Sequence, residues 1–318
     1  MVLSLVLNVV RGFAMGAADI VPGVSGGTVA LLLGIYERLI GSIRAGSKAL
    51  VLLLKADVAG FRKWMALVDW AFLLPLGAGL LLAVLSLASV LQRLLSDEPE
   101  FMAALFMGLV AGSVVVAWRL IRRPSVAHAL IVLAVGVVTF ALLGLQAGTS
   151  EESVGQISQP QLWAFFVAGA IAICAMILPG ISGSFLLVLM GMYGPVLAAV
   201  TDRDIATLGV FLAGAVIGLA LFSQVLYHAL RRYHDTMLAA LIGLMAGSIR
   251  VIWPWPDGVE STALGLPEGD VLAAVVAAVL AFAVVVVVGR FAQRIEVAEE
   301  SRASAVEDTP QAPAEAQG

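Results

Sequence analysis

Long apolar segments separated by short charged connectors make up most of the chain. Six of these segments are continuous and come close to the ~20 apolar residues that an α-helix needs to cross a bilayer. They cover residues 70–92, 101–118, 127–147, 206–228, 236–253 and 270–290. This pattern predicts an all-α polytopic membrane protein with six transmembrane helices.

Two further apolar segments, residues 1–40 and 161–200, are each interrupted near the middle by Pro-Gly. Proline removes a backbone donor and pushes the preceding residue out of helical geometry, and glycine lets the chain turn. The arms on either side have about 16–20 residues, near the lower limit for a span. We therefore expect two broken, re-entrant helical hairpins. A basic, amphipathic connector at 41–69 follows the first.

The composition agrees with a membrane protein. Hydrophobic residues make up 61% of the chain and charged residues 13%, and the mean hydropathy is +1.03. Soluble domains have about 45–50% apolar and about 25% charged residues. The polar segment 293–318 lacks aromatic residues, so we expect a disordered tail. The single cysteine, Cys174, excludes a disulfide within the chain.

The charges predict which side each connector occupies. Fifteen of the 18 Lys and Arg residues fall on one set of connectors: Arg11, Arg38, Arg44, Lys48, Lys55, Arg62, Lys63, Arg119, Arg122, Arg123, Arg231, Arg232, Arg290, Arg294 and Arg302. The opposite connectors are mainly acidic. Because basic loops stay in the cytoplasm, every span alternates without conflict and both termini are expected to be cytoplasmic.

The sequence contains an internal repeat. Residues 22–36, PGVSGGTVALLLGIY, match residues 179–193, PGISGSFLLVLMGMY, at an offset of 157. Residues 102–118 match residues 237–253 at an offset of 135. Two matched blocks in the same order indicate duplication, and the change of offset places an insertion between them. The connector 41–69 is the expected insertion.

Each half is therefore predicted to contain one broken hairpin and three transmembrane helices. The halves are residues 1–150 and 151–292. Because three is an odd number, the second half is expected to be inverted relative to the first. Inverted repeats with broken helices near the middle of the membrane are typical of secondary transporters.

The turn after each Pro-Gly is a candidate anion site. A serine at this place can cap the helix that resumes, and free N–H groups at a helix start attract anions. The glycines allow close backbone approach, and further hydroxyls lie nearby. The candidate phosphate-binding residues are Gly23, Ser25, Gly26, Gly27 and Thr28 at the first break and Gly180, Ser182, Gly183 and Ser184 at the second. The alternative is that Pro-Gly only kinks the helices. Repetition of the motif favours a functional role.

Four charged residues are weaker candidates. Asp19 precedes the first break, and Met176 takes its place in the second half. A carboxylate in an apolar segment points to proton or sodium coupling, or to a helix cap at a wet turn. Arg38, beside Glu37 after the first hairpin, either meets a lipid phosphate or anchors the chain at the cytoplasmic surface. Arg250 either attracts an anion from the outer leaflet or extends its charge to the interface.

No nucleophile motif, P-loop or dinucleotide fingerprint occurs in the sequence. The three histidines lack metal-ligand spacing. We therefore expect that the protein is not an enzyme, that it holds no metal or cofactor, and that it has no nucleic-acid partner.

The segments DIVPGVSGGTVALLLGIYERLI at 19–40 and LPGISGSFLLVLMGMYGPVL at 178–197 resemble a bacterial and archaeal membrane family. This family, long called a domain of unknown function, is that of the polyprenyl-phosphate translocases of the PopT type. The resemblance extends to about residue 292. It implies a plasma-membrane protein that returns undecaprenyl phosphate, the carrier lipid of envelope synthesis, from the outer to the cytoplasmic leaflet.

Two other functions stay open from the sequence. The same architecture suits an ion-coupled secondary transporter of a small anion. A membrane-embedded lipid phosphatase that uses a serine is a third hypothesis, against which the missing base and metal ligands argue. Bound polyprenyl phosphate would favour the translocase.

Overall fold

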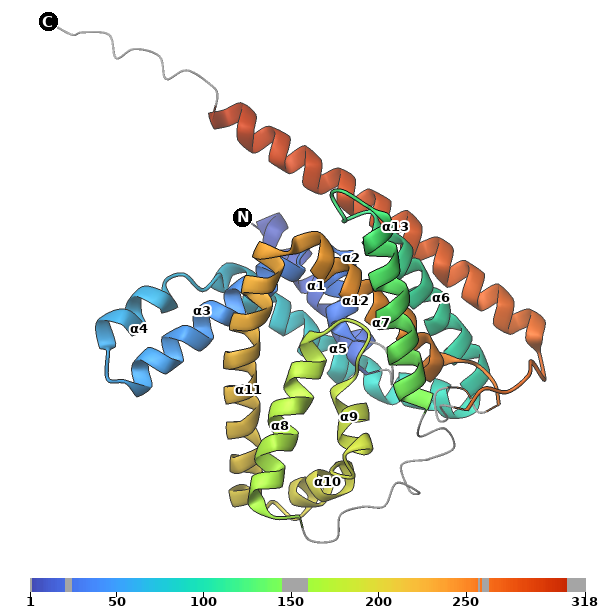
Figure 1. The fold of residues 1–318 in the computed structure, drawn as a ribbon, viewed down its shortest axis with the longest axis horizontal. Helices are drawn as coiled ribbons and strands as arrows, with labels where there is room; N and C mark the ends of the chain where they lie inside the picture. Colours follow the sequence, from blue (N-terminus) through green and yellow to red (C-terminus); the bar gives the residue numbers. More distant parts are fainter. Residues whose placement is uncertain (1, 21–24, 145–159, 257, 259–262, 308–318) are drawn as a thin grey trace, which may run out of the picture.

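The computed structural model describes residues 2–20, 25–144, 160–256, 258 and 263–307. Side chains are described within these ranges as far as Arg290, apart from Val2, Leu3 and Phe185. The described part of the chain is all-helical, as predicted (Figure 1). Gly23 lies outside the described residues.

Six helices in the described ranges are long and apolar enough to cross a membrane. They are α5 (Trp70–Asp97), α6 (Pro99–Trp118), α7 (Val126–Gly144), α11 (Ile205–Arg232), α12 with its 3-10 extension (His234–Ile252), and the first part of α13 (Val271–Arg290). These are the six predicted spans, and the prediction is confirmed. The chain is a multi-pass membrane protein.

Two of these helices, α6 and α12, occupy the centre of the molecule. In each, 56% of the apolar stretch is buried inside the protein, against 11–22% in the other four. The outer helices instead expose large apolar side chains, such as Leu85 of α5 and Leu221 of α11. Such side chains are stable where lipid, not water, covers them.

Helix pairing follows the sequence repeat. Helix α1 (Val2–Asp19) packs against α5, and α8 (Leu162–Ile177) packs against α11 in the same way. A Cβ atom on Gly12 would overlap the backbone of Leu76, and one on Gly169 would overlap the backbone of Phe211. Position 169 is 12 + 157 and position 211 is 76 + 135, so these two close contacts obey both offsets. Small residues at such contacts let membrane helices approach closely.

The other spans pair between the halves. Helix α6 packs along α13, and α12 packs along α7. Gly108 faces the backbone of Ala278, and its counterpart Gly243 faces Val132 and Val135. The two halves are therefore interlocked. Their inverted orientation, and the halves as domains, remain predictions.

The turns of the two hairpins also repeat. After the first break comes α2 (Gly26–Leu32), and after the second comes α9 (Gly183–Leu189). Two residues after the end of each helix comes a glycine with positive φ, at 71° for Gly34 and 65° for Gly191. Helices α3 (Tyr36–Leu54) and α10 (Tyr193–Thr201) then start in a new direction. A helix of seven residues is about 10 Å long, which is too short to cross the hydrocarbon of a bilayer.

One predicted boundary is corrected by α3. The first hairpin was expected to end at residue 40, but α3 runs without a break from Tyr36 to Leu54. Gly41 stands at the expected boundary, but glycine only lowers the stability of a helix by about 1 kcal/mol and does not end it as proline would, so α3 continues through this position. The extra 22 residues of the first half (157 − 135) lie in the later part of α3 and in α4 (Val58–Met65), where the predicted insertion lies.

The predicted tail also differs from the structure. Helix α13 extends to Glu307, so residues 293–307 are helical where disorder was expected. Alanine, glutamate and arginine are good helix formers, and a helix that has already been nucleated extends cheaply. Residues 308–318 lie outside the described residues.

Candidate functional site

The two Pro-Gly breaks lie against each other, although they are far apart in the sequence. A Cβ atom on Gly27 would lie 2.8 Å from the carbonyl oxygen of Ile177 and 3.4 Å from the nitrogen of Pro179. Glycine is therefore needed where α2 begins, because the backbone of the second break passes there. This arrangement brings together candidate residues from both halves.

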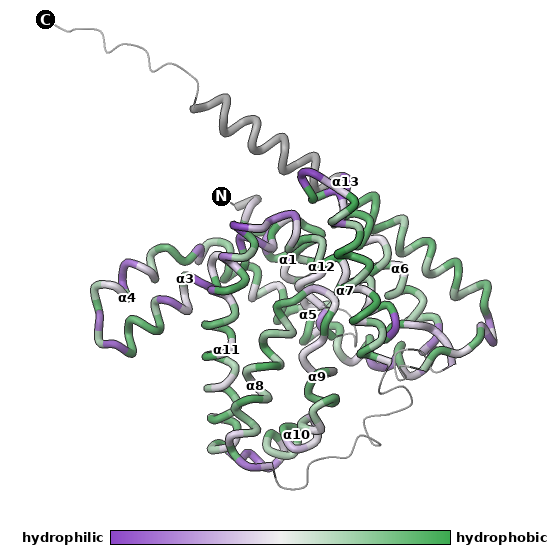
Figure 2. The backbone as a smooth tube through the Cα atoms, in the orientation of Figure 1, coloured by the Kyte–Doolittle hydropathy of each residue, from purple (hydrophilic) through white to green (hydrophobic). Residues whose placement is uncertain are grey.

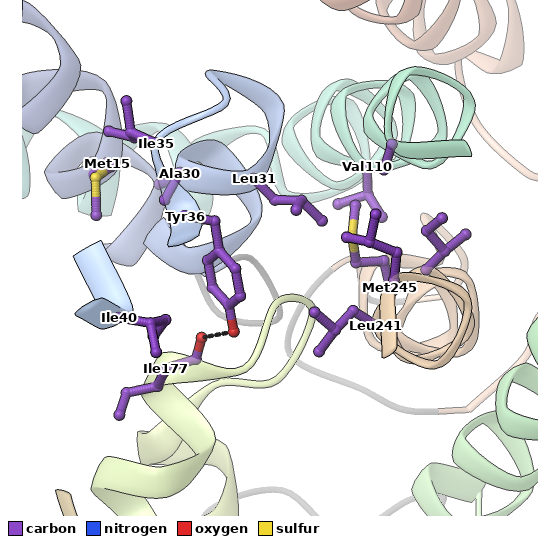
Figure 3. Close-up of a cluster of buried hydrophobic side chains, with 14 of the residues drawn as sticks. Met15, Ala30, Leu31, Ile35, Tyr36, Ile40, Val110, Ile177, Leu241 and Met245 are labelled. Atoms are coloured by element: carbon purple, nitrogen blue, oxygen red, sulfur yellow. Dashed lines mark hydrogen bonds between the residues drawn. The ribbon is translucent and has the colours of Figure 1, made fainter. Parts of the chain in front are cut away.

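Three hydrogen bonds join the breaks within the described residues. The Ser25 hydroxyl donates to the Met176 carbonyl at 3.3 Å, and the Gly180 N–H donates to Thr28 Oγ1 at 3.0 Å. The Tyr36 hydroxyl donates to the Ile177 carbonyl at 3.0 Å (Figure 3). Side chains of the first half thus satisfy backbone groups of the second, as buried backbone groups require.

The first break is closed by its own polar groups. Ser25 caps α2, since its Oγ accepts from the Gly27 N–H at 3.1 Å. Asp19 Oδ1 accepts from the Gly26 N–H at 2.5 Å. Ser25 and Thr28 are each only 2% exposed. The prediction of a serine cap is confirmed here, and Asp19 is a partner of the same helix start.

The second break is more open. Ser182 does not cap α9, contrary to expectation, and instead shares a hydrogen bond of 2.8 Å with Ser184. Met176 stands where the first half has Asp19, and it crowds Gly183. Ser182 is half-buried and Ser184 is exposed. The second break therefore presents two accessible hydroxyls, whereas those of Ser25 and Thr28 are already used.

The length of the helices limits one part of the predicted anion site. Helices α2 and α9 have seven residues each, or about two turns. So few aligned peptide groups provide only a weak dipole. The hydroxyls and the backbone N–H groups of the breaks, not the helix dipoles, are the stronger anion-binding groups.

Glu37 and Arg38 do not pair with each other. Arg38 binds Asp69 at 2.5 Å and lies over the Phe72 ring, with its guanidinium carbon 4.3 Å from the ring centroid. Glu37 Oε1 lies 2.9 Å from His234 Nε2. These contacts tie the start of α3 to α5 and α12. Within the described structure, these contacts of Glu37 and Arg38 are made away from the breaks.

Arg250 lies with α7 and not with the breaks. Its guanidinium carbon is 4.9 Å from the centroid of the Phe140 ring, and it packs beside Gly144. The α7 helix thus covers this charge near the end of the span. The structure brings Asp19 and the serine-glycine residues together, and it leaves Arg250 outside this group.

Sequence reasoning missed two features. The first is Tyr36, which links the breaks, and its recurrence at position 193 of the repeat was the available signal.

The second is a polar cluster around His234. Besides Glu37, His234 bonds to Asp235, whose carboxylate accepts from the backbone N–H groups of Arg122 and Arg123. A small cavity beside this cluster is lined by Glu37, Tyr227, Leu230 and Arg231. No local motif announces this cluster. Among the described residues, no group of histidine, cysteine or acidic side chains has the arrangement of a metal site.

Comparison with known proteins places the chain in a family. The model of the undecaprenyl phosphate translocase-like family matches residues 15–265, which include both breaks and five of the six spans. The chain belongs to this family. The match confirms the resemblance found in the two Pro-Gly motifs.

Two relatives share the name polyprenyl-phosphate transporter. A protein of Vibrio cholerae called polyprenyl-phosphate transporter is 41% identical over 249 residues, which cover 78% of this chain and 77% of the relative. A protein of Staphylococcus aureus with the same name is 31% identical over 298 residues, or 89% of this chain and 96% of the relative. No solved structure matches this chain.

Proposed function

We propose that this protein moves a polyprenyl phosphate, undecaprenyl phosphate in particular, from the outer to the cytoplasmic leaflet of a bacterial or archaeal plasma membrane. The lipid would then be recycled for envelope synthesis. The family, the names of the two relatives and the six apolar helices support this function. The observation that carries it is the joining of two polar breaks inside an otherwise apolar bundle.

The substrate has two parts with opposite requirements. A phosphate is costly to place in hydrocarbon unless hydrogen-bond donors receive it. At the second break, the hydroxyls of Ser182 and Ser184 and the backbone of Gly183 would receive it. Met176, beside this break, is 48% exposed on the surface of the protein. The polyprenyl chain can therefore stay in the lipid while the headgroup enters.

The first break would take part after a rearrangement. Ser25 and Thr28 hold the second break in this structure, so a phosphate between the breaks must replace these hydrogen bonds. The remaining proposed contacts are Gly23, Gly26, Gly27 and Gly180. Exchange of protein contacts for substrate contacts would give access from alternate sides, as in transporters with inverted repeats.

We assign the coupling of lipid transport to a proton or a sodium ion to the first half of the chain. Asp19 is the one proposed site residue with a carboxylate at a break, and Met176 replaces it in the second half. It would carry a proton or a sodium ion. Glu37 and Arg38 would hold the cytoplasmic end of the hairpin, and both termini would be cytoplasmic. Arg250 would attract the headgroup at the outer surface.

Transport would leave the lipid chemically unchanged, so the protein would not be an enzyme. Purified protein should therefore retain polyprenyl phosphate, detected by mass spectrometry, and should release no inorganic phosphate from it. Release of phosphate would favour a lipid phosphatase. Binding of free phosphate with no binding of the lipid would favour a transporter of a small anion.

The site is tested by a binding comparison between two variants. Ser182→Ala with Ser184→Ala removes both accessible hydroxyls and should weaken binding of polyprenyl phosphate by about tenfold or more, since each charged hydrogen bond contributes about 1.5–3 kcal/mol. Ser86→Ala is the control, because Ser86 is an exposed serine whose hydroxyl, in the described structure, donates to carbonyl groups of its own helix. Equal binding by the unmodified protein, the double variant and the Ser86→Ala control would contradict the assignment of Ser182 and Ser184 to the phosphate site.

A further inference from the structure

The later part of α3 and all of α4, residues 50–65, form a helical hairpin that projects from the bundle (Figure 1). We call this unit the α3–α4 hairpin. The buried residues of α3 end at Ala49, and α4 has none. It belongs to the insertion found only in the first half, so the repeated transport scaffold does not require it.

The α3–α4 hairpin carries apolar side chains that the protein does not cover. Leu54 is 79% exposed and Val58 58%, and Leu53 and Val51 are 44% and 41% exposed. Just beyond α4, Leu67 is 59% exposed. So many large apolar groups within one short unit form a patch of the kind that marks a site of interaction.

The same unit is basic. Residues 50–65 contain three basic residues, Lys55, Arg62 and Lys63, and one acidic residue, Asp57. Figure 2 shows hydrophilic and hydrophobic residues interleaved along the hairpin. The Lys48 ammonium lies 4.1 Å from the centroid of the Trp64 ring, with Arg44 on the same ring at 5.5 Å. Lys55, Arg62 and Lys63 are exposed at the tip and on α4.

The hairpin is continuous with a transmembrane helix. Only residues 66–69 separate α4 from α5, which begins at Trp70. The Trp70 ring is 44% exposed, and its Nε1–H donates to the Met65 carbonyl at 3.1 Å. Tryptophan at the end of a span marks the level of the lipid headgroups. The hairpin therefore starts at the membrane surface.

We propose that the α3–α4 hairpin lies in the headgroup region of the cytoplasmic leaflet and binds the anionic phospholipids there. Its apolar side chains would enter the boundary between headgroups and acyl chains, and its Lys and Arg side chains would meet lipid phosphates. Amphipathic helices with basic and apolar groups bind anionic membranes in this way. The basic charge of the unit matches the negative surface of that leaflet, and the acyl chains beneath the headgroups would cover Leu54 and Val58, which the protein leaves exposed.

The test uses the full-length protein in vesicles of phosphatidylcholine, with or without phosphatidylglycerol. Cys174→Ser removes the native thiol, and Leu54→Cys then carries an environment-sensitive NBD label. With phosphatidylglycerol, the emission should shift to the blue, and lipids brominated on their acyl chains should quench it. Emission typical of water in both vesicles would overturn the proposal, as would cross-linking of Leu54→Cys between two copies.

The role of charge is tested by two matched triple variants in the labelled protein. Lys55→Gln, Arg62→Gln and Lys63→Gln remove charge from the hairpin, while Arg119→Gln, Arg122→Gln and Arg123→Gln remove equal charge from another basic connector. The first set should lose the effect of phosphatidylglycerol on quenching, and the second should keep it. Equal behaviour of the two sets would contradict binding of anionic lipid by this hairpin.

Discussion

At Gly180, the backbone has a φ of +83°, and a Cβ atom would lie 2.6 Å from the Cα of Met245. Residues with a side chain rarely adopt such a conformation, and they lose roughly 1–2 kcal/mol there before any clash is counted. The second break thus depends on this glycine for both its turn and its packing against α12. The proline-glycine motif predicted the turn, but it gave no indication of Met245.

Gly180→Ala should therefore lower the melting temperature of the detergent-solubilised protein markedly. Gly77→Ala is the control, because a Cβ atom at Gly77 would meet nothing within 4 Å and alanine is the better helix former. Gly77→Ala should leave the melting temperature unchanged or raise it slightly. Similar losses in both variants would contradict the close packing of the second break.

Tyr36→Phe tests the link between the breaks. The tyrosine is 2% exposed, so its loss leaves the Ile177 carbonyl without that donor, at a cost of about 1–3 kcal/mol. We expect a lower melting temperature, measured by thermal unfolding in detergent. Tyr233→Phe is the control, since Tyr233 is 60% exposed and should tolerate the change. An unchanged Tyr36→Phe protein would mean that the two breaks are not held together by this bond.

At the scale of elements, the hydropathy pattern predicted each of the six spans found in the described part of the chain, because length and apolarity are local properties. It did not predict that the second arm of each hairpin is split into two helices, α2 and α3 in the first hairpin and α9 and α10 in the second. The apolar run after each break is continuous in sequence, and only the left-handed turns at Gly34 and Gly191 end α2 and α9 so soon. Glycine in an apolar helix more often serves packing. The sequence alone therefore gave no reason to expect a turn there.

Helix packing through glycine gives a prediction on α11. A side chain at Gly214 would overlap the Phe166 carbonyl of α8, whereas one at Gly209 would meet nothing within 4 Å. Gly214→Val should separate α8 from α11 and reduce the yield of folded protein in gel filtration. Gly209→Val, on the same helix, should behave like the parent protein. If the two variants gave equal yields, the α8–α11 contact would be of little importance.

At the scale of the whole molecule, the repeat predicted that the two breaks belong together, and the structure places them in contact. It did not predict the exchange of partners between the halves, in which α6 packs on α13 and α7 on α12. That arrangement depends on contacts such as Gly108 with Ala278, which no local pattern encodes. The bonding of Ser25 and Thr28 to the second break was likewise invisible, because it depends on how the halves pack.

Inversion of the halves predicts opposite labelling of equivalent positions. Ser96 and Arg231 are related by the offset of 135 and end α5 and α11, and both are exposed. In a Cys174→Ser background, a membrane-impermeant maleimide applied to intact cells should label Ser96→Cys and not Arg231→Cys. Permeabilised cells, in which both should react, are the control. Labelling of both positions in intact cells would contradict the inversion.

The most direct test of the account is transbilayer movement of the lipid itself. Liposomes with polyprenyl phosphate in both leaflets are given a phosphatase that cannot cross the membrane, and the phosphate that is released is measured over time. With this protein in the membrane, the whole pool should be consumed, and Ser182→Ala with Ser184→Ala should slow the second half of the reaction. If the inner pool stayed protected as in protein-free liposomes, the protein would not be a translocase of this lipid.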